Sequence, residues 1–174
     1  MKRLLCLSLM CLWATVAQAA DLKVGDTAPA LAVSKFVKGE PVKELQLGQT
    51  YVVEFWATWC GPCIENIPKL TAMQKKYGNK VVFVGVSVWE RDQSKVVPFV
   101  TKMGSKMNYR VAMDKVQGND ASNGYMATNW VKAAGRKGIP CAFIVNKEGK
   151  IAWIGHPAQM EKVIDNVLAG VAIK

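Results

Sequence analysis

Two cysteines separated by Gly-Pro occur where a short apolar run meets a helical pattern, in the stretch Trp59-Cys60-Gly61-Pro62-Cys63. Upstream, residues 51–57 are apolar and β-rich apart from Glu54, as is typical of a strand buried on both faces of a sheet. Downstream, apolar residues recur at helical spacing until Gly78-Asn79 supplies a stop. The chain is therefore predicted to pass from a strand directly into a helix, with the cysteine pair at the junction.

The rest of the chain continues as an alternation of strands and helices. An apolar run at 80–88 follows the first helix and completes a βαβ unit, whose crossover is expected to be right-handed. The next helix ends at Gly104 and contains Pro98, so it either begins late or kinks there. The remaining predicted elements are a strand at 109–113, a helix at 125–134, a β-hairpin at 141–155 and a helix from Pro157. This order indicates an α/β fold with a central mixed β-sheet flanked by helices.

The length of 174 residues fits one domain with attachments. Residues 1–19 have the form of a signal peptide, with a charged start, an apolar core and the small-residue exit Ala17-Gln18-Ala19. We expect cleavage near Ala19-Ala20, export to the periplasm, and a domain of residues 20–174 that does not span the membrane. The alternative is an uncleaved anchor, although the apolar core falls short of the roughly 20 residues of a spanning helix. The turn-rich residues 20–49 are expected to form an N-terminal β-hairpin extension.

Cleavage changes both the cysteine count and the charge. Cys6 and Cys11 leave with the signal peptide, and the mature chain keeps Cys60, Cys63 and Cys141, too few for a disulfide-stapled scaffold. The formal charge of +10 falls by two, and the remaining lysines are scattered rather than grouped in a run. Scattered basic side chains indicate solvated surfaces, so we expect no nucleic-acid partner.

The close pair of cysteines is best interpreted as a redox centre. A thiolate is the species that attacks disulfides, and a free cysteine with a pKa of ~8.5 is mostly protonated at neutral pH. If the helix begins at Gly61-Pro62, its unpaired N–H groups and its dipole favour the anion of Cys60. Cys60 is therefore predicted to attack, and Cys63 to resolve the mixed disulfide. We expect no cofactor beyond the Cys60–Cys63 disulfide, and no metal.

Glu54 is the acid within the apolar strand that precedes the cysteines. An unpaired buried carboxylate is costly, so its pKa is expected to be raised. From this strand Glu54 could take the proton from Cys63 when that residue attacks. The alternative is that Glu54 lies near a strand edge and reaches water or a lysine.

Three further features have both a structural and a functional interpretation. Ile139-Pro140 is either a turn before a strand or a cis peptide that presents the Ile139 backbone to an extended peptide. Cys141 is interpreted as a small buried hydrophobe rather than a redox group. His156 is interpreted as the start of a helix. A zinc site made of the cysteine pair, Cys141 and His156 is the alternative, but it lacks the second closely spaced ligand pair that zinc sites usually show.

These features together resemble the thioredoxin superfamily. The resemblance rests on Val53-Glu54-Phe55-Trp56-Ala57, on Trp59-Cys60-Gly61-Pro62-Cys63, on Pro68 in the following helix and on Gly138-Ile139-Pro140 before a strand. The signal sequence and the residues around the cysteines resemble the exported TlpA/ResA-like branch of that superfamily. Cys141 departs from the pattern, because the position after the proline usually holds threonine or another small residue.

The resemblance covers most of the mature chain and implies a thioredoxin-like fold. It also implies a cis Pro140 beside the dithiol, Cys60 as the nucleophile, Cys63 as the resolving residue and an assisting acid at Glu54. The residues expected to contact the substrate are Trp59, Gly61, Pro62, Ile139 and Pro140.

The sequence thus predicts an exported thiol-disulfide oxidoreductase that acts on protein disulfides. Gly-Pro between the cysteines resembles the reducing members, which favours a disulfide reductase supplied by a membrane electron donor, because the periplasm is oxidising. By resemblance, candidate substrates include cytochrome c apoproteins and copper-site cysteines. One alternative is a copper metallochaperone or another metal-binding module that uses the CxxC pair. The other is a thiol peroxidase, although no Pro-x-x-x-Thr-x-x-Cys sequence surrounds any cysteine.

Overall fold

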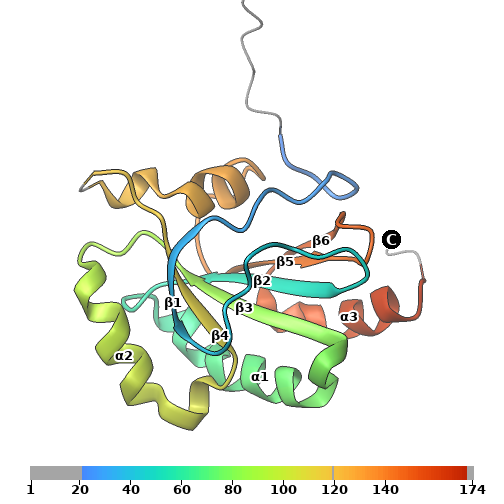
Figure 1. The fold of residues 1–174 in the computed structure, drawn as a ribbon, viewed down its shortest axis with the longest axis horizontal. Helices are drawn as coiled ribbons and strands as arrows, with labels where there is room; N and C mark the ends of the chain where they lie inside the picture. The colour runs from blue at the N-terminus through green and yellow to red at the C-terminus, as the bar shows by residue number, and fades with distance from the viewer. Residues whose placement is uncertain (1–20, 119, 172–174) are drawn as a thin grey trace, which may run out of the picture.

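The computed structural model describes residues 21–118 and 120–171 and is shown in Figure 1. The predicted signal peptide and its cleavage point lie outside the described residues. Among the residues that are described, none of the helices combines the length and the apolar character needed to cross a bilayer.

The core of the fold is a six-stranded sheet with the order β1-β4-β3-β2-β5-β6. Its strands are β1 (Val33–Lys38), β2 (Thr50–Trp56), β3 (Val81–Ser87), β4 (Arg110–Asp114), β5 (Cys141–Val145) and β6 (Ile151–Gly155). The pairs β2–β3 and β3–β4 are parallel, whereas β1–β4, β2–β5 and β5–β6 are antiparallel. This confirms the predicted mixed sheet, with β2 buried along its whole length near the centre.

Helices cover both faces of the sheet (Figure 1). One face packs against α1 (Gly61–Tyr77), α2 (Val96–Met103) and α3 (Met160–Leu168). The other face packs against a π-helical segment, η5 (Ala127–Lys132), and against the N-terminal segment. Short 3₁₀ turns occur at η1 (Gly78–Lys80), η2 (Gln93–Lys95), η3 (Gly104–Met107), η4 (Ala121–Asn123) and η6 (Pro157–Gln159). The arrangement is the predicted α/β sandwich.

The predicted N-terminal hairpin is wrong. The described part of this segment, residues 21–49, contributes one strand, β1, which pairs antiparallel with β4, and Thr27 makes an isolated bridge to Lys150. The chain turns after β1 at Gly39, which has a positive φ of 73°, and Pro41 follows without an N–H to donate to a ladder. The strand therefore pairs with the free edge of β4 instead of with a neighbouring segment.

The helix that contains Pro98 begins late, which is one of the two alternatives that the sequence left open. The Ser94 N–H donates to Asp92 Oδ1 at 3.0 Å and caps the short turn η2, and α2 starts at Val96. Pro98 is then the third residue of α2, within the first turn, where a backbone N–H has no partner inside the helix. No kink is needed to accommodate it.

A buried carboxylate holds η5 against the sheet. Asp114 ends β4 and is almost fully buried. Its Oδ1 accepts from the Met126 N–H at 2.8 Å, and its Oδ2 accepts from the Ala127 N–H at 3.0 Å. Gly124 lies against the same carboxylate, where a Cβ would clash with Oδ2.

Replacing Asp114 with alanine should reduce the free energy of unfolding by about 2 to 3 kcal/mol, because two buried N–H groups lose their charged acceptor. Urea unfolding followed by circular dichroism measures the change. Asp120→Ala is the matched control, since exposed Asp120 caps η4 by accepting from the Ser122 N–H at 2.8 Å. A loss in Asp114→Ala no larger than the loss in this control would contradict the interpretation.

Candidate active site

The cysteine pair forms a disulfide at the start of α1. The sulfurs of Cys60 and Cys63 are bonded, and the two Cα atoms are 5.2 Å apart. β2 ends at Trp56 and α1 begins at Gly61, which confirms the predicted strand-to-helix junction. Cys60 is the N-cap of α1, and the Cys63 N–H donates to Cys60 Sγ at 3.3 Å. The first turn of α1 thus directs a backbone N–H and its positive dipole end at the sulfur of Cys60, an arrangement that stabilises a thiolate.

The two sulfurs differ in their access to a partner protein. Cys63 is fully buried beneath the turn, whereas Cys60 keeps 4% of its surface exposed. The neighbours of Cys60 form an exposed rim, with Trp59 56% exposed and Gly61 and Pro62 also exposed. An incoming sulfur can therefore reach Cys60 before Cys63, which is the order of access that the predicted attacking and resolving roles require.

Ile139 and Pro140 lie across from the disulfide. The Ile139–Pro140 peptide bond is cis, as the resemblance implied. Cys60 Sγ lies 3.8 Å from the Ile139 carbonyl oxygen, although the two residues are far apart in sequence. Both residues are half-buried. The structure thus brings together the predicted nucleophile and the predicted peptide-binding backbone.

Glu54 is buried in the central strand and does not reach the surface. The side chain is 1% exposed, which excludes the alternative of a solvated acid at a strand edge. Val52 and Trp56, its neighbours on the same face of β2, pack in the same core layer as Cys63. Burial raises the pKa of Glu54 to about 8, and neither carboxyl oxygen has a hydrogen-bond partner among the described residues. A carboxyl with such a pKa is well placed to exchange protons near neutral pH.

Glu90 is a site residue that the sequence analysis missed. It is buried, and its Oε1 accepts from the Thr58 N–H at 2.6 Å and from the Ser87 hydroxyl at 2.9 Å. Its Oε2 accepts from the Thr58 hydroxyl at 2.8 Å. These bonds fix the loop between β2 and Cys60 to the end of β3. The sequence did contain a signal for Glu90, which is an acid that follows closely after β3. Because the carboxyl ends of the parallel strands β2 and β3 lie at the same edge of the sheet, a side chain after β3 lies near the loop that leads to Cys60.

Trp59 is held over a small groove beside the disulfide. Its Nε1–H donates to the Trp89 carbonyl oxygen at 3.1 Å, and Trp89 has a positive φ of 55°. The groove has a volume of about 280 Å³ and is lined by Thr58, Trp59, Glu90, Arg91, Asp92 and Lys95. The exposed face of Trp59 and the two basic residues offer apolar and charged contacts next to Cys60.

The other candidate ligands lie apart from the disulfide. Cys141 is a free, buried thiol on the opposite face of the sheet from Cys63, and burial raises its pKa to about 11. His156 is exposed and begins the turn η6, where its Nδ1 accepts from the Ala158 N–H at 3.2 Å. Within the described part of the chain, no three His, Cys, Asp or Glu side chains are grouped as a metal site would require. These positions support the structural interpretation of both residues.

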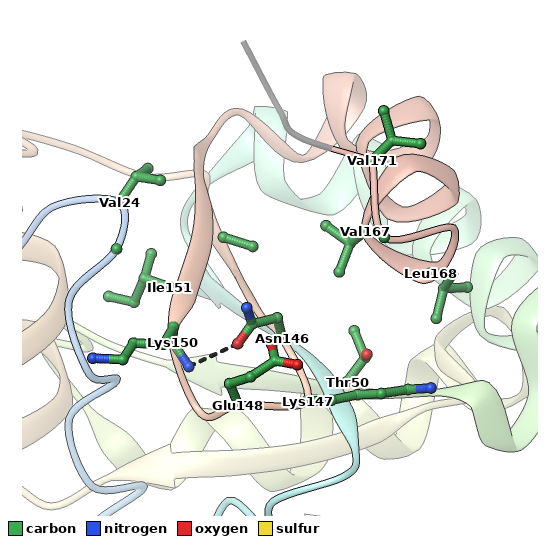
Figure 2. Close-up of a pocket in the computed structure, with 13 residues that line it drawn as sticks. Val24, Thr50, Asn146, Lys147, Glu148, Lys150, Ile151, Val167, Leu168 and Val171 are labelled. Carbon is green, nitrogen blue, oxygen red and sulfur yellow. Dashed lines mark hydrogen bonds between the residues drawn. The ribbon is translucent and has the colours of Figure 1, made fainter.

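A larger groove lies away from the disulfide, at the opposite end of β2 (Figure 2). It has a volume of about 690 Å³ and is walled by the β5–β6 turn, the end of α3 and Thr50, the first residue of β2. In Figure 2 the Lys150 backbone N–H donates to Asn146 Oδ1, at 2.8 Å, and closes this turn. Cys60 follows the other end of the same strand, so the groove is not part of the redox site.

The comparisons with known proteins agree with this geometry. The family model described as Redoxin matches residues 23–168. Protein FixW of Rhizobium leguminosarum is 30% identical over 159 residues, which cover 87% of this chain and 69% of FixW. The thiol:disulfide interchange protein HelX of Rhodobacter capsulatus is 30% identical over 154 residues, which cover 85% of this chain and 78% of HelX.

A solved structure gives the same result for the fold. The crystal structure of a thiol:disulfide interchange protein of the thioredoxin family from Chlorobium tepidum superposes with a TM-score of 0.58 at 25% identity. The match covers 86% of this chain and 99% of that one. The sheet and the helices therefore belong to a known architecture.

Proposed function

This chain belongs to the redoxin family, as a TlpA/ResA-like member of the thioredoxin superfamily with thiol-disulfide oxidoreductase activity, and we propose that it is an exported protein disulfide reductase. The observation that carries the proposal is the Cys60–Cys63 disulfide at the N-terminus of α1, with the Ile139 carbonyl 3.8 Å from the sulfur of Cys60. A redox pair and a peptide-binding backbone at one point suit a protein substrate.

The reaction proceeds in two exchange steps. In the reduced enzyme, the thiolate of Cys60 attacks a substrate disulfide, forms a mixed disulfide and releases one substrate thiolate, which takes up a proton. Cys63 then passes its proton to the carboxylate of Glu54 and attacks the sulfur of Cys60. The second substrate thiolate leaves and is protonated, and the enzyme is left with the Cys60–Cys63 disulfide. Two electrons have passed from the enzyme to the substrate.

The substrate binds as an extended segment across the rim of the site. Ile139 offers backbone groups beside the cis Pro140, and the exposed side of Trp59 with Gly61 and Pro62 forms the opposite wall. Glu90 keeps this wall in place through Thr58. The site therefore selects a cysteine in a flexible or unfolded segment rather than one in a packed core.

Export determines where the electrons come from. The signal-like residues 1–19 direct the protein to the periplasm, and the scattered positive charge of the chain requires no nucleic-acid partner. An oxidising compartment does not regenerate a dithiol, so a membrane protein that carries reducing equivalents must reduce Cys60–Cys63 after each turnover. Gly-Pro between the cysteines favours this direction of electron flow.

The reduction potential of the Cys60–Cys63 pair tests the proposal. Equilibration of the purified protein with glutathione buffers should give a value near ~−270 mV, as in thioredoxin, rather than near ~−120 mV, as in a strong oxidant. A value at the oxidising end would reverse the proposed direction. In parallel, the reduced protein is titrated with copper(I), and tight stoichiometric binding without reductase activity would replace the proposal with a metallochaperone.

A further inference from the structure

Buried polar atoms without partners are concentrated beneath the disulfide. Five such side-chain atoms occur among the described residues, and four of them belong to Glu54, Trp56 and Tyr109. They are the two carboxyl oxygens of Glu54, the Nε1–H of Trp56 and the hydroxyl of Tyr109. All three side chains are at most 5% exposed. Buried polar groups nearly always have a hydrogen-bond partner, either in the protein or in an ordered water. We therefore expect a hydrogen-bond partner for these four atoms.

The three side chains lie close around Gly85. It pairs with Glu54 across β2 and β3. A Cβ built on Gly85 would lie 3.4 Å from Glu54 Oε2, 3.4 Å from Trp56 Nε1 and 2.9 Å from a ring carbon of Tyr109. The carboxyl, the indole N–H and the phenol ring therefore converge on the point where any other residue would place a side chain.

The three groups have complementary hydrogen-bonding capacity. The indole of Trp56 can only donate, and the carboxylate of Glu54 can only accept. Burial, followed by the nearby charge of Glu54, raises the pKa of Tyr109 well above its usual range, so its phenol keeps its proton and can donate. A buried water typically makes about three hydrogen bonds, and these groups supply two donors and one acceptor.

We propose that Glu54, Trp56 and Tyr109 enclose a hydration site over Gly85, and that Tyr109 is a positioning residue that sets the proton affinity of Glu54 through a water bound there. The functional part rests on the proposed role of Glu54 as the base for Cys63. The water relays the donor groups of Trp56 and Tyr109 to the carboxylate and stabilises its charged form.

The surroundings of Glu54 contain few other titratable groups. Cys63 of α1 lies on the same side of the sheet, and Cys141 of β5, with Arg136 near it, lies on the other side. The side chains of α2 that pack in this layer are all apolar, namely Val96, Phe99, Val100 and Met103. β3 contributes Gly85, which has no side chain. Replacing Tyr109 with phenylalanine therefore changes the surroundings of Glu54 without adding or removing a charge.

The test is the pKa of Glu54 in Tyr109→Phe, measured in the reduced full chain by NMR titration of ¹³C-labelled glutamate carboxyls. Loss of the hydroxyl should raise this pKa by about one pH unit, because a hydrogen bond to a charged group is lost. The limb of the pH profile for decay of the mixed disulfide should move to higher pH by the same amount. Tyr77→Phe is the matched control, since the Tyr77 hydroxyl donates to Asp165 of α3, at 2.9 Å, and not toward Glu54.

A high-resolution crystal structure supplies the second readout, which should show an ordered water bonded to Glu54 in the wild type. Gly85→Ala should displace this water and raise the pKa of Glu54 in the same direction, and Tyr109→Phe decides the question if the alanine variant does not fold. An unchanged pKa of Glu54 in Tyr109→Phe, or a site without water in the crystal, overturns the inference. If instead the pKa moves as expected while Glu54→Gln resolves the mixed disulfide at the wild-type rate, the hydration site stands and the proposed role of Glu54 as a base fails.

Discussion

Cys60→Ser should lower kcat/KM for reduction of a protein disulfide by on the order of a thousandfold or more, because the hydroxyl cannot form the mixed disulfide on which both exchange steps depend. Insulin reduction with a chemical reductant measures this loss. Cys141→Ser is the matched control, since it removes a buried thiol whose pKa of about 11 keeps it protonated at neutral pH. That variant should retain activity close to the wild type.

Cys63→Ser should have a different outcome, which separates the two cysteines. Cys60 can still attack, but no thiol beneath it resolves the product, so a covalent complex with the substrate accumulates. The complex is visible on a non-reducing gel and should disappear when Cys60 is replaced as well. The adducts should be the same with and without Cys141→Ser. Adducts that persist without Cys60, or that require Cys141, would assign the nucleophile elsewhere.

The sequence contained most of the information on the fold because its central elements are specified locally. The apolar run of β2, the helical spacing after Cys63 and the stop at Gly78 each correspond to an observed boundary. The N-terminal segment was mispredicted because the residues of β1 are only partly buried and show no clear alternation of apolar and polar side chains. Such a pattern does not indicate which strand β1 pairs with. β1 pairs with β4, more than seventy residues away, and only the free edge of the completed sheet determines that pairing.

The active site divides in the same way. Cys60, Cys63, Glu54 and Pro140 stand out in sequence because their types are unusual for their local context. Glu90 and Tyr109 do not, since an acid after a strand and a tyrosine before one are common. Their importance comes from what the fold places next to them, namely the loop at Thr58 for Glu90 and the backbone of Gly85, beside the carboxyl of Glu54, for Tyr109. Contacts between separate strands cannot be inferred from spacing along the chain.

Because of Glu54, the free energy of unfolding should also fall by several kcal/mol as pH rises. The pKa of Glu54 is raised by burial from 4.5 to about 8 in the folded state. Between these values the folded protein holds a proton that the unfolded chain has released. The stabilising contribution is therefore fully present at acidic pH and is lost as pH rises toward and through 8. Linkage gives a total loss on the order of 3 to 5 kcal/mol.

Glu54→Gln removes this dependence, because the amide does not titrate in the same position. Urea unfolding of the oxidised protein between pH 5 and 8.5 should show the variant gaining stability relative to wild type by several kcal/mol across the range, on the order set by linkage. Asp114, whose pKa burial also raises, is common to both proteins and cancels in the difference. Cys141, with a pKa of about 11, stays protonated throughout.

Glu65→Gln is the control, because it removes an exposed acid from α1, and its free energy of unfolding should change with pH as that of the wild type does. A difference between Glu54→Gln and wild type that does not change with pH would mean that Glu54 is already ionised in the core. It would then need a cationic partner, which none of the described residues supplies.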